Sequence, residues 1–195
     1  FHSIFRPGST HAKHLHEASD EIAVYLSGKG VVGQDDSRAE VSSGHCRLIP
    51  KGSVHFFYNE TKHNDARVIG FYMNAPSITD TGYKFCGEVK SEDLTKSRDG
   101  LDGGILVRLE DVKPVNYSLL EAWKQAEVRF PIGIHNGSPN SLLHIKLQPR
   151  RCIEKIQHTN AEAIYYIEAG QGKIVDMACT RVITHDSFVF VPTAL

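Results

Sequence analysis

Short apolar runs that end at glycine or proline recur along the chain, and this pattern predicts an all-β protein. Residues 22–26, with the sequence IAVYL, are followed by the turn signal Gly28-Lys29-Gly30. Residues 188–191, with the sequence FVFV, lead into Pro192, and residues 105–109 have the same apolar character. Runs of this length between turn residues are typical of β-strands. We therefore expect strands and turns to make up most of the fold.

Two segments interrupt the strand pattern. Residues 118–128, with the sequence SLLEAWKQAEV, predict a short helix with Ser118 as its N-cap and Glu121 three residues further on. We expect Trp123 to pack this helix onto the neighbouring strands. Residues 76–104 are rich in Ser, Thr, Asp, Lys and Gly, which indicates a surface connection.

Four side chains that bind first-row transition metals occur between residues 14 and 55. His14 and His16 are two residues apart, so both point to the same side of a strand. Glu21 follows at the start of an apolar run, and His55 comes after the turn at residues 50–52. Imidazole and carboxylate ligands suit iron, manganese, nickel, copper, cobalt and zinc. If the chain folds back on itself, these four side chains converge, and the sequence predicts a metal site there.

The spacing of these residues resembles the two motifs of the cupin family. The first motif is a glycine, five residues, His-x-His, three or four residues, a glutamate, six residues and a glycine. The second is a glycine, five residues, Pro-x-Gly, two residues, a histidine, three residues and an asparagine. The matching positions are Gly8, His14, His16, Glu21, Gly28, Gly44, Pro50, Gly52, His55 and Asn59. The resemblance implies a double-stranded β-helix (jelly-roll) barrel with one divalent transition metal as its cofactor.

A second, weaker copy of the pattern follows at an offset of 142 residues. Residues 20–30, DEIAVYLSGKG, align without a gap with residues 162–172, EAIYYIEAGQG. This repeat makes the chain resemble a bicupin, a protein with two cupin barrels in tandem. We expect an N-terminal metal-binding barrel at residues 1–80, a linker at 81–104 and a C-terminal cupin-like barrel at 105–195.

The second copy lacks the metal ligands. The aligned pairs are His14 with Ile156, His16 with His158, and Glu21 with Ala163. Glu162 could take the place of the lost carboxylate with a small shift, but a single histidine does not hold a transition metal. The counterpart of the fourth ligand would be residue 197, beyond the sequence given. We expect a degenerate and truncated second barrel and a native protein longer at both ends, or barrels completed by strands from partner chains.

Composition argues against several classes of partner. The 23 acidic and 22 basic residues nearly cancel, and no basic stripe occurs, so nucleic acid is not expected. No apolar segment approaches the length of a membrane span. Four cysteines without a Cys-x-x-Cys pair favour free thiols in a reducing cytoplasm. The chain begins at Phe1 rather than Met, so the lack of a signal peptide carries little weight. The expected partners are a small-molecule substrate and a second copy of the chain in a homodimer.

The predicted ligands would leave coordination positions open on a five- or six-coordinate ion, which distinguishes a catalytic site from a closed structural one. Strand alternation puts Phe57 on the same face as His55, and Tyr25 on the same face as Glu21. Phe57 is therefore a candidate substrate contact, and Tyr25 is a candidate acid or a packed core residue. Arg47 would clamp a carboxylate substrate if it faces inward, and would be solvated if it faces outward, which is the orientation we favour.

Several functions share this ligand set among cupins. We favour a metal-dependent enzyme acting on a small organic molecule, of the non-haem dioxygenase type, because an open site with apolar lining suits O₂ and substrate together. A decarboxylase, lyase or isomerase of a small acid or sugar is the non-redox alternative, and an inward arginine would favour it. A ligand-binding or storage cupin without turnover is the third candidate.

His11 and His45 are either partners that orient the ligands or surface residues.

Overall fold

The computed structural model describes residues 1–115, 121–176 and 179–193. The chain forms two compact units. The first contains residues 1–116 and 127–146, and the second contains residues 117–126 and 147–195. Within the described residues, no helix has the length and apolar character needed to cross a membrane. The four cysteines are free, as expected.

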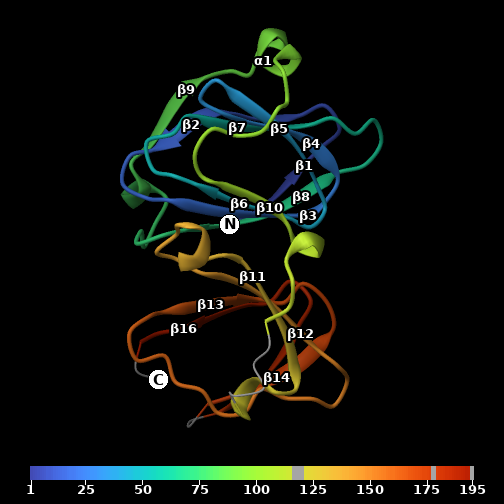
Figure 1. Cartoon of the computed structure of the whole chain (residues 1–195), viewed down its shortest axis with the longest axis vertical. Helices are drawn as coiled ribbons and strands as arrows, with labels where there is room; N and C mark the ends of the chain where they lie inside the picture. Colours follow the sequence, from blue (N-terminus) through green and yellow to red (C-terminus); the bar gives the residue numbers. More distant parts are fainter. Residues whose placement is uncertain (116–120, 177–178, 194–195) are drawn as a thin grey trace. The chain divides into compact units, whose positions relative to one another are not determined.

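Two five-stranded antiparallel sheets build the first unit (Figure 1). Strands far apart in sequence lie next to each other in each sheet, which is the arrangement of a jelly roll. In spatial order, the first sheet contains β1 (His2–Phe5), β8 (Ala66–Tyr72), β3 (Glu21–Ser27), β6 (His45–Ile49) and β10 (Ile105–Arg108). The second contains β5 (Ser37–Ser42), β4 (Lys29–Gln34), β7 (His55–Asn59), β2 (Thr10–His16) and β9 (Tyr83–Gly87). The all-β prediction is confirmed.

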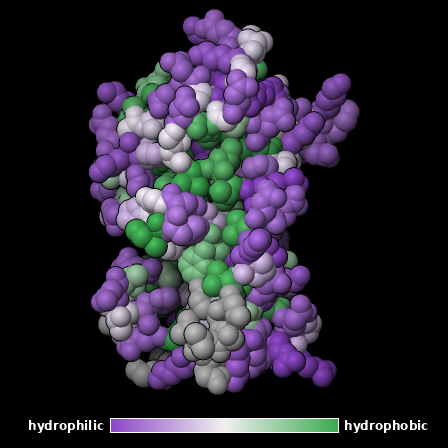
Figure 2. Space-filling model, in the orientation of Figure 1, coloured by the Kyte–Doolittle hydropathy of each residue, from purple (hydrophilic) through white to green (hydrophobic). Residues whose placement is uncertain are grey.

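Hydrophobic side chains from both sheets pack between them. Ala23 and Tyr25 of β3 meet Val32 of β4 and Phe57 of β7 in one buried cluster. Ile22 lies on the opposite face of β3, because successive side chains of a strand alternate between its two faces. On the face of this unit seen in Figure 2, hydrophilic side chains cover most of the surface, with hydrophobic ones showing between them.

A hairpin covers the outer face of the first sheet. It consists of β11 (Ala126–Ile132) and β12 (Leu142–Leu147), with the 3₁₀ turn η4 (Ile134–Asn136) in their connection. Ile132 of the hairpin is completely buried and packs in one cluster with Ile22, Cys46 and Leu48 of β3 and β6. The central strands β3 and β6 of the first sheet are therefore covered on both faces.

The helix expected at residues 118–128 differs from the structure. Its described part holds only the 3₁₀ turn η3 (Glu121–Trp123), and β11 begins at Ala126. Ser118 lies outside the described residues, and Trp123 is half-buried. Burial of Val128 and Ile132 on the hairpin outweighs the helical propensity of the segment, which is a weak preference that tertiary packing overrides.

The segment expected to be a surface connection contributes to the first unit instead. It contains the 3₁₀ turn η1 (Thr79–Thr81), strand β9 and the short helix α1 (Ser91–Thr95), and β9 pairs with β2 at the sheet edge. Asp93 of α1 is buried and forms ion pairs with Lys13 and Arg38. Strand β10, which the sequence placed in the second barrel, pairs with β6 of the first unit and is followed by η2 (Leu109–Asp111).

The second unit repeats the strand pairing of the first. Strand β13 (Ala163–Tyr166) pairs with β16 (Phe188–Val191), and β14 (Gln171–Val175) pairs with β15 (Thr180–Thr184). The registers keep the offset of 142 residues. Glu21 opposes Ile49 and Ala163 opposes Val191, while Lys29 opposes Ser42 and Gln171 opposes Thr184. The repeat found in the sequence is thus a repeat of sheet structure.

Candidate metal centre

Four side chains from both sheets of the first unit converge inside the jelly roll. His14 and His16 project from β2, Glu21 begins β3 and His55 begins β7. All four are buried, and one ligand atom from each lies within 4.8 Å of the other three. The structure therefore brings together every residue that the sequence predicted as a metal ligand.

Local backbone structure positions this group. Strands β2 and β7 pair with His14 directly opposite His55, and the register shifts by a bulge between His11 and His14. The turn before His55 is tied to β2, because the Gly52 N–H donates to the His16 carbonyl at 2.8 Å. Gly52 has a φ of 81°, a conformation that side chains with a Cβ rarely adopt. The glycine of the second motif thus fixes the approach of His55.

The tautomers of two histidines follow from their neighbours. His14 Nδ1 lies 2.8 Å from the Ala12 carbonyl oxygen, and His55 Nδ1 lies 3.0 Å from that of Ser53. A carbonyl oxygen only accepts, so each Nδ1 carries the proton and donates it. The Nε2 atom of each ring therefore presents an unprotonated lone pair to the centre of the group.

His16 is oriented by a residue that the sequence did not single out. Thr81 donates its hydroxyl hydrogen to the Ile78 carbonyl at 2.7 Å, so its oxygen is left to accept from His16 Nδ1 at 2.8 Å. Thr81 is fully buried, although it belongs to the polar segment interpreted as a surface connection. No motif marks this position, because the contact depends on how η1 folds against β2.

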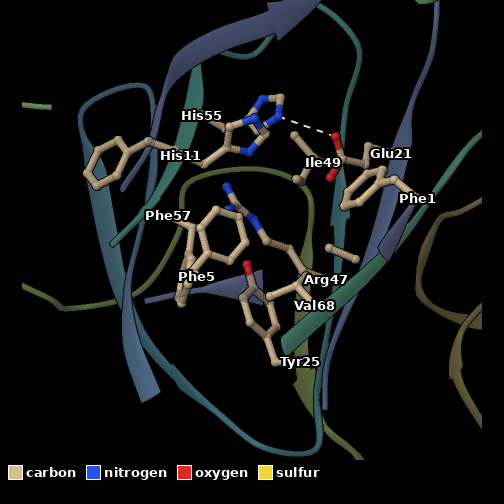
Figure 3. Close-up of a pocket in the computed structure, with 12 residues that line it drawn as sticks. Phe1, Phe5, His11, Glu21, Tyr25, Arg47, Ile49, His55, Phe57 and Val68 are labelled. Carbon is tan, nitrogen blue, oxygen red and sulfur yellow. Dashed lines mark ion pairs between the residues drawn. The ribbon is translucent and has the colours of Figure 1, made fainter. Parts of the chain in front are cut away.

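The four ligand atoms fit a bound cation. His14 Nε2, His16 Nε2, His55 Nε2 and Glu21 Oε2 are buried and have no hydrogen-bond partner. Glu21 Oε2 lies 3.2 Å from His16 Nε2 and 3.5 Å from His55 Nε2, the second contact being the dashed line in Figure 3. With the protons on Nδ1, these contacts bring lone pairs together in a buried site, which is unfavourable without a cation. The donor set suits one divalent transition metal ion.

The ionisation states also suit metal binding. Burial, together with the charge of nearby His55, lowers the pKa of His14 to about 3, so His14 is neutral at pH 7. Burial alone would raise the pKa of Glu21, but hydrogen bonds from His16 and His55, and the charge of these histidines when they are protonated, outweigh it and hold the pKa below the ordinary value. A neutral imidazole and an ionised carboxylate are the forms that coordinate metals.

A small cavity of about 20 Å³ lies beside Glu21 and His55. Arg47, Tyr25 and Phe57, the three further residues that the sequence singled out, all line it (Figure 3). Arg47 therefore faces inward, and the outward orientation that the sequence analysis favoured is wrong. This volume holds only one or two water-sized groups.

The two further histidines occupy different places. His11 lines the cavity, and its ring centre lies 4.1 Å from that of His14. His45 is half-buried at the start of β6, where its Nδ1 lies 3.0 Å from the Ser42 backbone nitrogen. Of this pair, His11 contacts a candidate ligand, whereas His45 bonds its own turn.

Comparison with known proteins agrees with this geometry. Residues 1–72 match the family described as Cupin domain. The N-terminal part of the chain is a cupin domain. Oxalate oxidase GF-3.8 of Triticum aestivum is 33% identical over 82 residues, which cover 38% of this chain and 37% of that protein. Germin-like protein 3-3 of Oryza sativa subsp. japonica is 30% identical over 82 residues, covering 38% and 36%. The matched segment thus spans little more than a third of the length of these relatives.

Solved structures extend the likeness to the rest of the chain. The formate complex of Lactobacillus farciminis oxalate decarboxylase has a TM-score of 0.70 at 15% identity, covering 99% of this chain and 69% of that chain. A single-residue variant of the oxalate decarboxylase of Bacillus subtilis has a TM-score of 0.68 at 14% identity, covering 99% and 62%. At these identities the likeness establishes the fold alone. It agrees with the strand repeat seen in the second unit.

Proposed function

We propose that this protein is a metal-dependent cupin enzyme acting on a small organic acid, in which His14, His16, Glu21 and His55 hold the ion. The observation that carries the proposal is the set of four buried ligand atoms without hydrogen-bond partners. When bound, a divalent ion at such a site polarises an oxygen group of a substrate or takes part in electron transfer. Manganese is the first ion to test, since the oxalate decarboxylase of Bacillus subtilis has Mn(II) centers.

The chain's own residues supply binding and proton control. Phe5 and Phe57 line the cavity with apolar surface, which limits the entry of water. Burial raises the pKa of Tyr25, and neighbouring Arg47 only partly offsets this, so the Tyr25 hydroxyl keeps its proton at neutral pH. Tyr25 would therefore act as a hydrogen-bond donor to a bound substrate rather than as a base.

Two reaction classes suit the site. Decarboxylation is supported by the inward Arg47, the feature that favours the non-redox alternative. Oxygen-dependent chemistry, the class to which the expected dioxygenase belongs, is supported by the apolar lining and by the sequence similarity to wheat oxalate oxidase. The products from oxalate distinguish them. A decarboxylase releases one CO₂ and formate without consuming O₂, whereas an oxidase consumes O₂ and releases two CO₂ and hydrogen peroxide.

We also propose a cytoplasmic location, which the four free thiols support.

Metal analysis of the purified protein tests the proposal. We expect about one transition metal ion per chain, identified by anomalous scattering at several absorption edges. Replacing His14 and His16 together by alanine should remove that ion, because half of the ligand set is lost. His158→Ala, at the position aligned with His16 in the second unit, is the matched control and should leave the metal content unchanged. An ion at full occupancy in the double variant would contradict the assignment.

A further inference from the structure

Arg47 is a buried cation with unused hydrogen-bonding capacity. It lies on β6 with only 1% of its surface exposed. One terminal nitrogen, Nη2, donates to the Gly33 carbonyl at 2.9 Å and to Gln34 Oε1 at 3.2 Å, both on the opposite sheet. The Nε atom is buried and has no partner. Among the described residues, no carboxylate forms an ion pair with Arg47.

A second buried arginine shows the ordinary structural arrangement. Arg38 of β5 is 2% exposed, and its Nη2 pairs with Asp93 Oδ1 at 3.1 Å. Its Nε donates to the Asp93 carbonyl at 3.0 Å, and its guanidinium lies 4.8 Å from the centre of the Phe56 ring. A buried charge normally has such a counter-ion, because an unpaired one is costly. The two arginines differ in that Arg47 lacks an internal anion and borders a cavity.

The surroundings hold Arg47 in place for an external ligand. Gln34 is buried, and its amide nitrogen donates to the carbonyls of Asp102 at 2.8 Å and Gly103 at 3.0 Å. These bonds leave Oε1 of Gln34 to accept from Arg47, so Gln34 is a positioning residue. In Figure 3 the guanidinium lies between the His55 end of the cavity and the Tyr25 hydroxyl. The cationic guanidinium of Arg47 and the neutral hydroxyl of Tyr25, both hydrogen-bond donors, thus border the same cavity.

We propose that Arg47 is the residue that selects a carboxylate anion for this cavity, by binding one carboxylate group while the reacting end of the substrate faces Glu21 and the histidines. The inference rests on the proposed function and deepens it by naming the substrate charge and its binding residue. A divalent ion with one carboxylate ligand, together with Arg47, leaves an excess of positive charge that an anionic substrate would neutralise. The small cavity limits the substrate to a few non-hydrogen atoms.

Binding of formate and of its neutral counterpart formamide tests this role. We expect the metal-loaded protein to bind formate, measured by calorimetry, and to bind formamide much more weakly. Arg47→Gln should weaken formate binding about 10- to 100-fold, since hydrogen bonds to charged groups are among the strongest in proteins. Arg47→Lys keeps the charge without the planar fork, so it should restore part of the affinity.

Arg38→Gln is the matched control, because it also removes a buried guanidinium from this unit. It should lower the thermal midpoint while leaving formate affinity unchanged. Metal content is measured in every sample, so that the metal-dependent function and the anion-binding role of Arg47 are tested separately. A wild-type protein without metal contradicts the proposed function but not the anion site. Arg47 has no role in selection if Arg47→Gln retains the ion and binds formate as tightly as the wild type does. Equal wild-type affinity for formate and formamide would also overturn the proposal.

Discussion

The two repeats of this chain share their strand registers but differ in what the strands enclose. In the first, β3 pairs with β6 next to a buried group of metal-binding side chains. In the second, β13 pairs with β16 in the equivalent register, with Ala163 in the position of Glu21. In the described part of the chain, no second group of metal-binding side chains forms. The strand pairing therefore does not depend on the ligands, and the first site is a separate property of its side chains.

The difference traces to the strands that carry the histidines. In the first repeat, β2 pairs with β7, and this pair supplies His14, His16 and His55. In the second, residues 151–162 form no strand, although their counterparts include β2. Many side chains of the two strand pairs in the second repeat are exposed, with 69% of Val182 and 58% of Phe190 accessible, whereas Val32 in the first repeat is fully buried. The same strand pair encloses the first core and holds most of its ligands.

Replacing one glutamate in each repeat by glutamine is the strongest test of this difference between the repeats. Glu21→Gln keeps the side-chain shape but removes the charged ligand. Loss of a residue that only orients a ligand lowers metal affinity by up to roughly 100-fold, so we expect loss of the ligand itself to lower it by more. Glu162→Gln removes the exposed carboxylate next to Ala163 and should change nothing. Equilibrium dialysis against manganese measures both affinities. The contrast between the repeats fails if Glu162→Gln also releases the ion.

A buried charge network in the first repeat gives the next largest effect. Asp93 forms ion pairs with Lys13 at 2.9 Å and with Arg38 at 3.1 Å. Asp93→Ala would leave Arg38 buried and unpaired, and we expect the free energy of unfolding to fall by about 3 kcal/mol. Urea unfolding of the metal-free protein measures it. The control is Asp36→Ala, which removes an exposed partner of Lys96 and should have little effect.

The pH dependence of that stabilisation has a definite sign. Burial would raise the pKa of Asp93, but hydrogen bonds from the Lys90 backbone and the Lys13 side chain outweigh it, and the pKa lies below the ordinary value. The stabilisation is therefore present above the ordinary aspartate pKa and is lost as the pH falls through the lowered one. The difference between wild type and Asp93→Ala should shrink in acid. A difference that stays constant down to that range would show that the ion pairs are not its cause.

The sequence predicted the ligands well because a few fixed spacings determine them. His14 and His16 share a strand face, and the turn residues before His55 return the chain to the same place. The direction of Arg47 was predicted wrongly for a physical reason. Its neighbours Cys46 and Leu48 are apolar but face outward, under the hairpin β11–β12, so apolar character did not mark the inner face of β6. Asp93 and Thr81 were missed because polar residues that are buried with partners look like surface residues in sequence.

Thr81 provides the smallest and most specific test of why only the first repeat would hold metal. Thr81→Val keeps the shape of the side chain but removes the oxygen that accepts from His16 Nδ1 at 2.8 Å. His16 then has a buried N–H without a partner and is no longer held with its proton on Nδ1, so the Nε2 lone pair is less available. We expect metal affinity to fall about tenfold, the lower end of the effect of losing an outer-shell partner. Thr81→Ser keeps the hydroxyl and should restore the affinity. If the serine variant binds metal as weakly as the valine variant, then Thr81 acts through packing, and orientation of His16 does not explain the site.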